Sequence, residues 1–161
     1  MRITDLLDKR SISLDAVCAS KSDALDQAVA LMVKSGKIND EEAYRKQVYL
    51  REEESTTGIG EGIAIPHGKC DAVSKPGLAA MVVPDGVDYV AFDGSLANLI
   101  FMIAAPEGEA DVHLEALSRL SNSVRTLDQM VALNEKRLQD LEQELKKEKE
   151  KNEEKTDHHR M

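Results

Sequence analysis

Two stretches before residue 55 carry apolar residues at the spacing of an amphipathic helix. Between residues 22 and 35 the apolar side chains recur at steps of three and four, at Leu25, Ala28, Val29, Met32 and Val33. Ser22 can cap the start of this helix, and Gly36 can end it in a left-handed conformation. A second helix is predicted from the capping-box-like Asn39-x-x-Glu42, and it ends near Arg51.

Two short apolar runs farther along the chain predict buried strands. Residues 77–84 and 99–106 contain no charged side chain, and each run ends in a proline. Such runs are typical of strands that are covered on both faces of a sheet. A weaker alternation at residues 11–14 is compatible with a further strand. Helices followed by strands then predict an α/β fold, with a layered mixed β-sheet flanked by helices.

A heptad pattern fills the last part of the chain. A helix is predicted from Asp111, and beyond residue 124 there is no glycine or proline. Apolar positions alternate steps of three and four at Leu117, Leu120, Val124, Leu127, Val131, Leu138, Leu141 and Leu145, with Asn134 in the same series. We expect a domain over residues 1–124 and then a charged heptad helix over residues 125–161, which extends as a coiled coil and has a disordered end from residue 146.

Composition excludes several classes of partner. The net charge of -9 argues against nonspecific binding to nucleic acid or to anionic lipid, because a phosphate-rich partner needs a basic surface. With no apolar run of membrane-spanning length and no leader-like segment, we expect a soluble, cytoplasmic protein without membrane insertion. Cys18 and Cys70 are far apart, so neither a disulfide framework nor a zinc site is predicted, and we expect no cofactor.

The stretch from Gly58 to Gly68 carries the candidate chemistry. Three glycines at alternate positions precede a short apolar strand, residues 63–65, and Pro66 then restricts the backbone before His67. Gly68 is expected to leave open space after the histidine. An imidazole held at a stiff strand end suits a nucleophile that another macromolecule must reach.

The segment from Glu53 to Gly68 closely resembles the phosphorylation-site motif of the fructose/mannitol-type EIIA domains of the bacterial phosphoenolpyruvate:sugar phosphotransferase system. The resemblance covers residues 1–124 and includes a second histidine, His113, in the first turn of the helix from Asp111. It implies that His67 accepts a phosphoryl group from the phosphohistidine carrier HPr and passes it to a cysteine of an EIIB domain. It also implies that His113 lies beside His67 and that Arg51 binds phosphoryl oxygens.

The residue chemistry agrees with these roles and leaves alternatives open. A neutral imidazole is a competent nucleophile, and Arg51, His113 and the amides of the glycine loop are suitable donors to phosphoryl oxygens. Arg51 could instead form surface ion pairs with its glutamate neighbours, and His113 could be merely exposed. Residues 55–57 could bind phosphate or only cap and turn the chain, and Glu61 could orient His67 or be solvated.

The C-terminal helix departs from the family, in which residues after the second histidine fold back and close the domain. A seam of about four heptads favours homo-oligomerisation through residues 117–145 over a helix packed on its own domain. We expect a phosphocarrier for sugar uptake; the alternatives are a regulatory module of the nitrogen-related branch and a purely structural oligomer. The sugar cannot be predicted, because an EIIA domain need not touch it.

Overall fold

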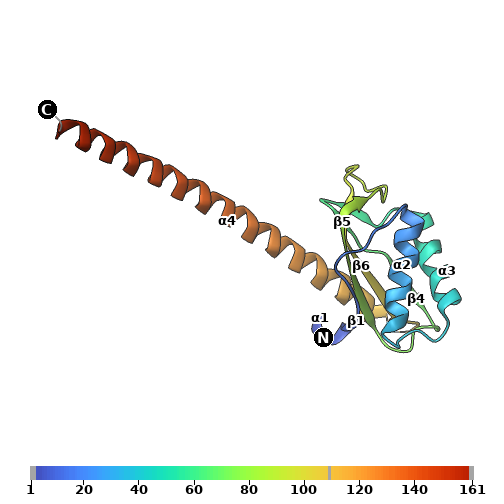
Figure 1. Cartoon of the computed structure of the whole chain (residues 1–161). Coiled ribbons are helices and arrows are strands. Elements are labelled where there is room, and N and C mark those ends of the chain that lie inside the picture. Colours follow the sequence, from blue (N-terminus) through green and yellow to red (C-terminus); the bar gives the residue numbers. More distant parts are fainter. Residues whose placement is uncertain (1–2, 109, 160–161) are drawn as a thin grey trace. The chain divides into compact units, whose positions relative to one another are not determined.

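The computed structural model describes residues 3–108 and 110–159 (Figure 1). Of residues 3–4, 110–118, 120–121 and 123–128 it describes the backbone alone. The chain divides into two compact units, Met1–Arg119 and Leu120–Met161. The first unit thus ends at residue 119, whereas the sequence predicts a domain that ends at residue 124. Both positions lie inside one continuous helix.

Within the described residues, six strands of the first unit form one mixed sheet. The strand order is β1-β5-β6-β3-β2, and β4 also pairs with β6. The layered mixed sheet flanked by helices is therefore confirmed. In chain order the elements are α1 (Ile3–Leu6), β1 (Leu7–Ser13), α2 (Lys21–Lys34), α3 (Glu41–Glu54), β2 (Gly58–Gly60), β3 (Ile63–Ala64), β4 (His67–Cys70), β5 (Gly77–Val87) and β6 (Ala97–Pro106).

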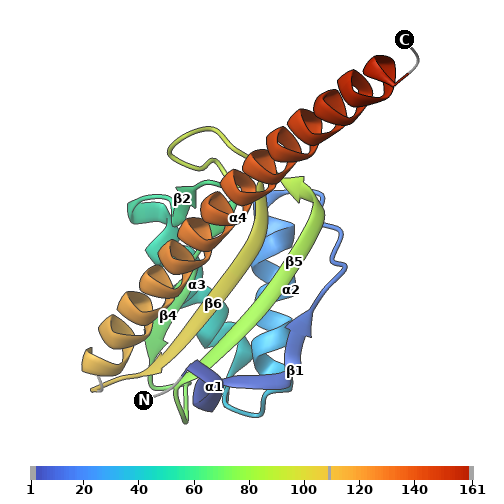
Figure 2. The same cartoon turned by 90° about the vertical axis from the view of Figure 1, so that its left-hand side faces the viewer.

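β6 is the strand around which the sheet is built (Figure 2). It pairs antiparallel with β5, and its other edge pairs in parallel with β3 and then with β4. The sequence predicts that His67 ends a strand. In the structure it begins one, because it is the first residue of β4 and opposes Ile103 of β6. The reason is Pro66: it has no N–H to donate, so the ladder breaks there, while its carbonyl accepts a hydrogen bond from Ile103 N at 3.0 Å.

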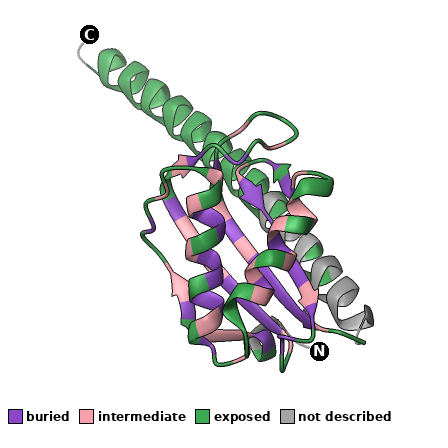
Figure 3. Ribbon diagram, turned by 90° about the vertical axis from the view of Figure 1, so that its right-hand side faces the viewer, coloured by how far each residue is buried: buried purple, intermediate pink, exposed green. Residues whose placement is uncertain are grey.

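Helices α2 and α3 lie against one face of the sheet, and the main core lies between them and the strands (Figure 3). Both predicted helices are confirmed, but their caps are not the predicted ones. Ser20 Oγ accepts a hydrogen bond from Asp23 N at the start of α2, and Asp40 Oδ1 accepts one from Ala43 N at the start of α3. The predicted stop at Gly36 is confirmed by its φ of 78°.

The central strands β5 and β6 are buried on the face toward α2 and α3, but the burial on both faces that the apolar runs predict is only partial, because Ala80, Val82, Leu99 and Phe101 on the other face are half-buried. Met81 belongs to the core beneath the helices. Leu78 and its cross-strand neighbour Ile103 lie outside that core and are only 1% and 2% exposed. The sheet face away from α2 and α3 is therefore also covered at these positions.

The C-terminal helix α4 (Ala110–His158) is 49 residues long. It starts one residue before Asp111, which therefore lies inside the helix and not at its N-cap. The helix continues to His158, through most of the stretch from residue 146 for which a frayed or disordered end is predicted, and residues 160–161 lie outside the described residues. Lysine and glutamate at positions four apart, such as Lys146 and Glu150, favour helix without any apolar seam. Within the described residues no helix combines the length and the apolar character needed to cross a membrane.

Candidate functional site

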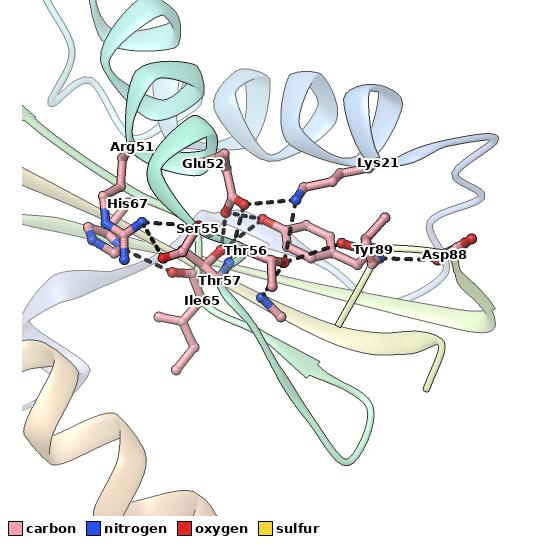
Figure 4. A network of polar contacts seen from close by, with 12 residues as sticks. Lys21, Arg51, Glu52, Ser55, Thr56, Thr57, Ile65, His67, Asp88 and Tyr89 are labelled. Carbon is pink, nitrogen blue, oxygen red and sulfur yellow. Dashed lines mark hydrogen bonds and ion pairs between the residues drawn. The ribbon is translucent and has the colours of Figure 1, made fainter. Parts of the chain in front are cut away.

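His67 has its two ring nitrogens in different surroundings. Nδ1 lies 3.0 Å from the carbonyl oxygen of Ile65, two residues earlier in the chain (Figure 4). A carbonyl can only accept, so this hydrogen bond requires the proton on Nδ1 and leaves the lone pair of the neutral ring on Nε2. The residue is 9% exposed, so the ring is largely but not completely removed from water.

The surroundings of His67 favour its neutral form. Burial lowers the pKa of the imidazole below its ordinary value, and the positive charge of Arg51 lowers it further. The hydrogen bond to Ile65 and the carboxylates of Glu52 and Glu54 act in the opposite direction, and the net pKa remains lowered. The lowered pKa favours an uncharged His67 ring at neutral pH, which is the form that can act as a nucleophile.

Arg51 and His67 share a cavity of about 270 Å³ at the C-terminal end of α3. Arg51 Nη1 donates to the carbonyl oxygen of Ser55 at 3.1 Å, and its guanidinium lies beside the His67 ring in Figure 4. Lys69 brings a second cation to the cavity wall, and Glu54 brings a carboxylate. The structure thus brings two of the three predicted site residues together, in a cavity that could bind an anion.

His113, the third predicted site residue, lies in the first turn of α4. Its side chain is outside the described residues, so its position beside His67 stays a prediction.

The contact between α3 and β4 sets the relative position of Arg51 and His67. The Tyr44 hydroxyl of α3 donates to the carbonyl oxygen of Ile103, the residue that opposes His67 in the sheet. A Cβ added to Gly68 would come within 2.9 Å of the Tyr44 ring and 3.0 Å of Val48. Gly68 therefore allows close packing of α3, and the open space expected beside it is absent.

A buried carboxylate that the sequence did not single out anchors the segment after α3. Glu52 accepts hydrogen bonds from the Tyr89 hydroxyl at 2.6 Å, from the backbone N–H of Thr57 at 3.2 Å and from the Thr57 hydroxyl, and forms an ion pair with Lys21 at 2.9 Å (Figure 4). The Glu52 side chain is 6% exposed, and the Lys21 ammonium also lies 4.7 Å from the centre of the Tyr89 ring. The network joins the start of α2, the end of α3 and, through Tyr89, the segment that connects β5 to β6.

The charge of Glu52 is stabilised within this network. Burial raises the pKa of the carboxyl, but the hydrogen bonds from Thr57, Tyr89 and Lys21 outweigh it, and the net pKa is lowered. Burial raises the pKa of Tyr89, and the adjacent Glu52 carboxylate raises it further. A consecutive run of three glutamates gave no sign that the first one would be buried, because its partners are distant in sequence.

The glycine-rich loop is a tight hairpin between β2 and β3. Gly60 and Gly62 have φ values of 94° and 82°, and Glu61 between them also has a positive φ, 56°. The Glu61 N–H donates to Asp93 Oδ2 at 2.9 Å, and the Gly62 N–H donates to Ser95 Oγ at 3.3 Å. The residues lining the cavity beside His67 do not come from this hairpin. The loop at residues 93–95 therefore occupies the amides of Glu61 and Gly62, and binding of phosphoryl oxygens by the glycine loop stays a prediction.

The hydroxyl side chains after α3 also have structural partners. Ser55 Oγ lies 3.5 Å from Arg51 Nη1, Thr56 Oγ1 accepts from Lys21 Nζ and from Gly58 N, and Thr57 belongs to the Glu52 network. Of these three, only Ser55 contacts a residue of the cavity wall. Among the described residues, no group of three His, Cys, Asp or Glu side chains could hold a metal ion.

The comparison with protein families gives one clear match. Residues 5–148 match the model described as the phosphoenolpyruvate-dependent sugar phosphotransferase system, EIIA 2. The match extends 24 residues beyond position 124, into the heptad helix.

Two relatives show how much of other proteins this chain covers. It is 50% identical over 121 residues to the fructose-specific EIIABC component of Bacillus subtilis. The aligned residues make up 75% of this chain and 19% of that protein. It is 42% identical over 113 residues to the fructose-specific EIIA component of Haloferax volcanii. Here the aligned residues make up 70% of this chain and 73% of that protein. The chain thus spans about a fifth of the first relative and most of the second.

Two solved structures share the fold. The nitrogen regulatory protein IIA-Ntr of Neisseria meningitidis is 31% identical with a TM-score of 0.69, over 74% of this chain and 82% of that one. The enzyme IIA of the complex of enzyme IIAMTL and phosphorylated enzyme IIBMTL from Escherichia coli is 30% identical with a TM-score of 0.65, over 74% and 83%. With a family match over most of its length, the chain belongs to the EIIA 2 family of the phosphoenolpyruvate-dependent sugar phosphotransferase system.

Proposed function

We propose that His67 is the phosphoryl acceptor of this chain, taking the group from an HPr-like phosphocarrier and passing it to a cysteine of an EIIB domain or subunit. The observation that carries the proposal is the neutral His67 ring, anchored through Nδ1 and sharing a cavity with Arg51. The transfer requires no metal or cofactor from this chain.

The transfer is an in-line displacement at phosphorus. The Nε2 lone pair of His67 forms the new N–P bond while the N–P bond of the donor phosphohistidine breaks, and that electron pair returns to the donor ring. His67 then carries a proton on Nδ1 and the phosphoryl group on Nε2, so its ring becomes positively charged. The carbonyl of Ile65 stabilises this charge through the existing hydrogen bond.

Arg51 is the proposed ligand of the phosphoryl oxygens. Its guanidinium has five N–H donors in a planar fork, and the contact with Ser55 leaves that fork beside the His67 ring. Catalysis of phosphoryl transfer consists mainly of positioning and charge stabilisation, and a fixed guanidinium provides both. His113 is proposed as a second donor to the same oxygens.

The partners follow from the same proposal. A relative of this fold has been solved in complex with a phosphorylated enzyme IIB, which supports an EIIB module as the recipient. We place the exchange in the cytoplasm. We further propose that the chain forms a homo-oligomer through residues 117–145, and that it binds neither nucleic acid nor the interior of a membrane.

The alternative is a regulatory role in which the phosphorylation state of His67 controls a protein partner. The similarity to a nitrogen regulatory IIA-Ntr protein supports it. The two roles differ in the fate of the phosphate. In the sugar role it moves to an EIIB cysteine, and in the regulatory role it stays on His67 and changes which protein is bound.

Phosphorylation by phosphoenolpyruvate, enzyme I and HPr tests the acceptor. Mass spectrometry is expected to find the label on His67, and His67→Ala should abolish it, while the matched variant His158→Ala, which alters an exposed histidine near the end of α4, should keep it. Label on the His67→Ala protein would refute the assignment. An EIIB domain added afterwards then separates the transport role from the regulatory one.

His113→Ala should slow the transfer without removing the acceptor, because His67 still supplies the nucleophile. Rapid-quench measurement of the labelling rate checks this. A rate equal to that of the unaltered protein would remove His113 from the mechanism.

A further inference from the structure

The second half of α4 exposes a regular apolar seam. Val131, Leu138, Leu141 and Leu145 are 55%, 60%, 61% and 57% exposed, and they share one face of the helix. Four large apolar side chains at heptad spacing do not remain in water when a complementary surface is available. We propose that this seam pairs with the same seam of a second copy of the chain as a parallel, in-register, two-stranded coiled coil. The inference deepens the proposed self-association and rests on it.

The heptad positions follow from the order of the steps. Val131, Leu138 and Leu145 take position a, and Asn134 and Leu141 take position d. Positions e and g, which flank this seam, then carry charged side chains: Glu135, Glu142 and Lys149 at e, and Arg137, Glu144 and Lys151 at g. All of these residues are exposed in α4.

Charge complementarity decides the direction of pairing. In a parallel pair, a g residue meets the e residue five positions later on the partner helix. Arg137 then meets Glu142 of the partner subunit, and Glu144 meets Lys149 of the partner subunit. Both contacts are attractive, and the twofold symmetry repeats each of them.

An antiparallel pair would instead bring e against e and g against g. Three successive e positions, Asp128, Glu135 and Glu142, are acidic, so every register that pairs two of them opposes like charges. An antiparallel register that pairs Arg137 with Glu144 of the partner subunit gains one attraction. The same register places Glu135 opposite Glu142 of the partner subunit, where the two negative charges repel. Only the parallel arrangement makes both pairs described above without an acidic clash.

Asn134 selects the same arrangement. In a parallel, in-register pair it meets Asn134 of the partner subunit, and the two amides can hydrogen-bond across the seam. In an antiparallel pair a d residue faces an a residue, here valine or leucine, and the amide would be buried without a partner. The polar residue thus costs some stability and specifies register and direction.

The arrangement has a consequence for the phosphoryl acceptor. Because each acceptor unit precedes its helix in the chain, parallel pairing attaches both units at the same end of the coiled coil. Two His67 sites would then be presented together, and a partner with two docking modules would engage the second at high effective concentration.

A charge-reversal cycle in the full chain tests the direction. Arg137→Glu should weaken dimerisation roughly tenfold in analytical ultracentrifugation, because it turns both symmetry-related attractions into repulsions. Adding Glu142→Arg should restore affinity to within about threefold of the unaltered chain, because the pair is re-formed with its charges exchanged. The matched control Lys136→Glu, at the outward position f, should leave the affinity unchanged. A double variant that is no tighter than Arg137→Glu would overturn the parallel register.

Disulfide trapping is the second measurement. In a Cys18→Ser background, Leu141→Cys should cross-link two chains rapidly under mild oxidation, because identical d positions face each other only in a parallel, in-register pair. Gln143→Cys, on the outward face, should cross-link far more slowly. A chain that stays monomeric at high micromolar concentration would overturn both the self-association and this inference. If the chain dimerises but Glu142→Arg does not restore the affinity lost in Arg137→Glu, or Leu141→Cys does not cross-link, the parallel register alone is overturned. The labelling of His67 tests the proposed phosphoryl transfer separately from either outcome.

Discussion

A single backbone carbonyl makes the two nitrogens of His67 chemically different. The hydrogen bond from Nδ1 to Ile65 orients the ring and assigns the lone pair to Nε2. Pro66 lies between the two residues and limits the backbone conformations that could break this bond. Burial lowers the pKa of the imidazole, and the charge of the neighbouring Arg51 lowers it further and would also attract a phosphoryl group.

Arg51→Gln should raise the pKa of His67, because it removes a positive charge that disfavours the imidazolium. The pKa in the folded protein lies below the ordinary 6.5, so the stability linked to His67 is present above about pH 6.5 and is lost as the pH falls toward the folded value. In Arg51→Gln the folded pKa should lie closer to 6.5, so the pH range over which this stability is lost should be narrower. NMR titration of the His67 ring measures its pKa in the unaltered protein and in Arg51→Gln. Lys46→Gln, an exposed change on the same helix, is the control. An unchanged pKa in Arg51→Gln would contradict this account.

Glu52→Gln should destabilise the fold by about 2–3 kcal/mol, because it leaves Lys21 and two hydroxyl donors facing a neutral amide. The lowered pKa of Glu52 means that its contribution is present above pH 4.5 and is lost as the pH falls through the folded value. Urea unfolding at pH 7 measures the loss, and the exposed neighbour Glu53→Gln should cost little. Equal stability of the two variants would show that the network is not a stabilising one.

At the scale of elements, the site depends on how α3 packs on β4. The sequence predicts α3 and a helix-end position for Arg51, and the structure confirms both. Periodicity cannot predict that Tyr44 bonds Ile103, 59 residues away, or that Gly68 is the point of closest approach. Those contacts decide whether Arg51 and His67 share one cavity.

Gly68→Ala should destabilise the domain by about 1–3 kcal/mol and slow the phosphorylation of His67. The added methyl group would meet the Tyr44 ring and Val48, so α3 would have to move away from β4 and carry Arg51 with it. Thermal unfolding and the labelling rate measure the two effects. Alanine tolerated without loss of either would contradict the close packing.

At the scale of the whole molecule, the chain consists of two units with different sources of stability. The first has a core under α2 and α3, whereas the described side chains of α4 from residue 129 to residue 158 are exposed. A helix of that kind gains its burial from another chain or another surface.

Leu141→Asp should therefore abolish self-association and leave the phosphorylation rate of His67 within about twofold of the unaltered protein, since the buried charge affects only the paired seam. Sedimentation and the labelling assay on the same preparation check both results. A large loss of labelling would mean that the helix also supports the acceptor site.

The sequence by itself determined the helices, the two long strands and the identity of His67 as the candidate nucleophile. Apolar spacing reports which local structure can bury one face, and the motif around His67 is contiguous in the chain. Only the tertiary structure decided that Glu52 is a buried anchor, that the glycine loop amides bind residues 93–95, and that Gly68 packs against α3. These features depend on partners that lie far away in the sequence, such as Glu52 and Tyr89 at a separation of 37, and no local pattern encodes which distant groups will meet.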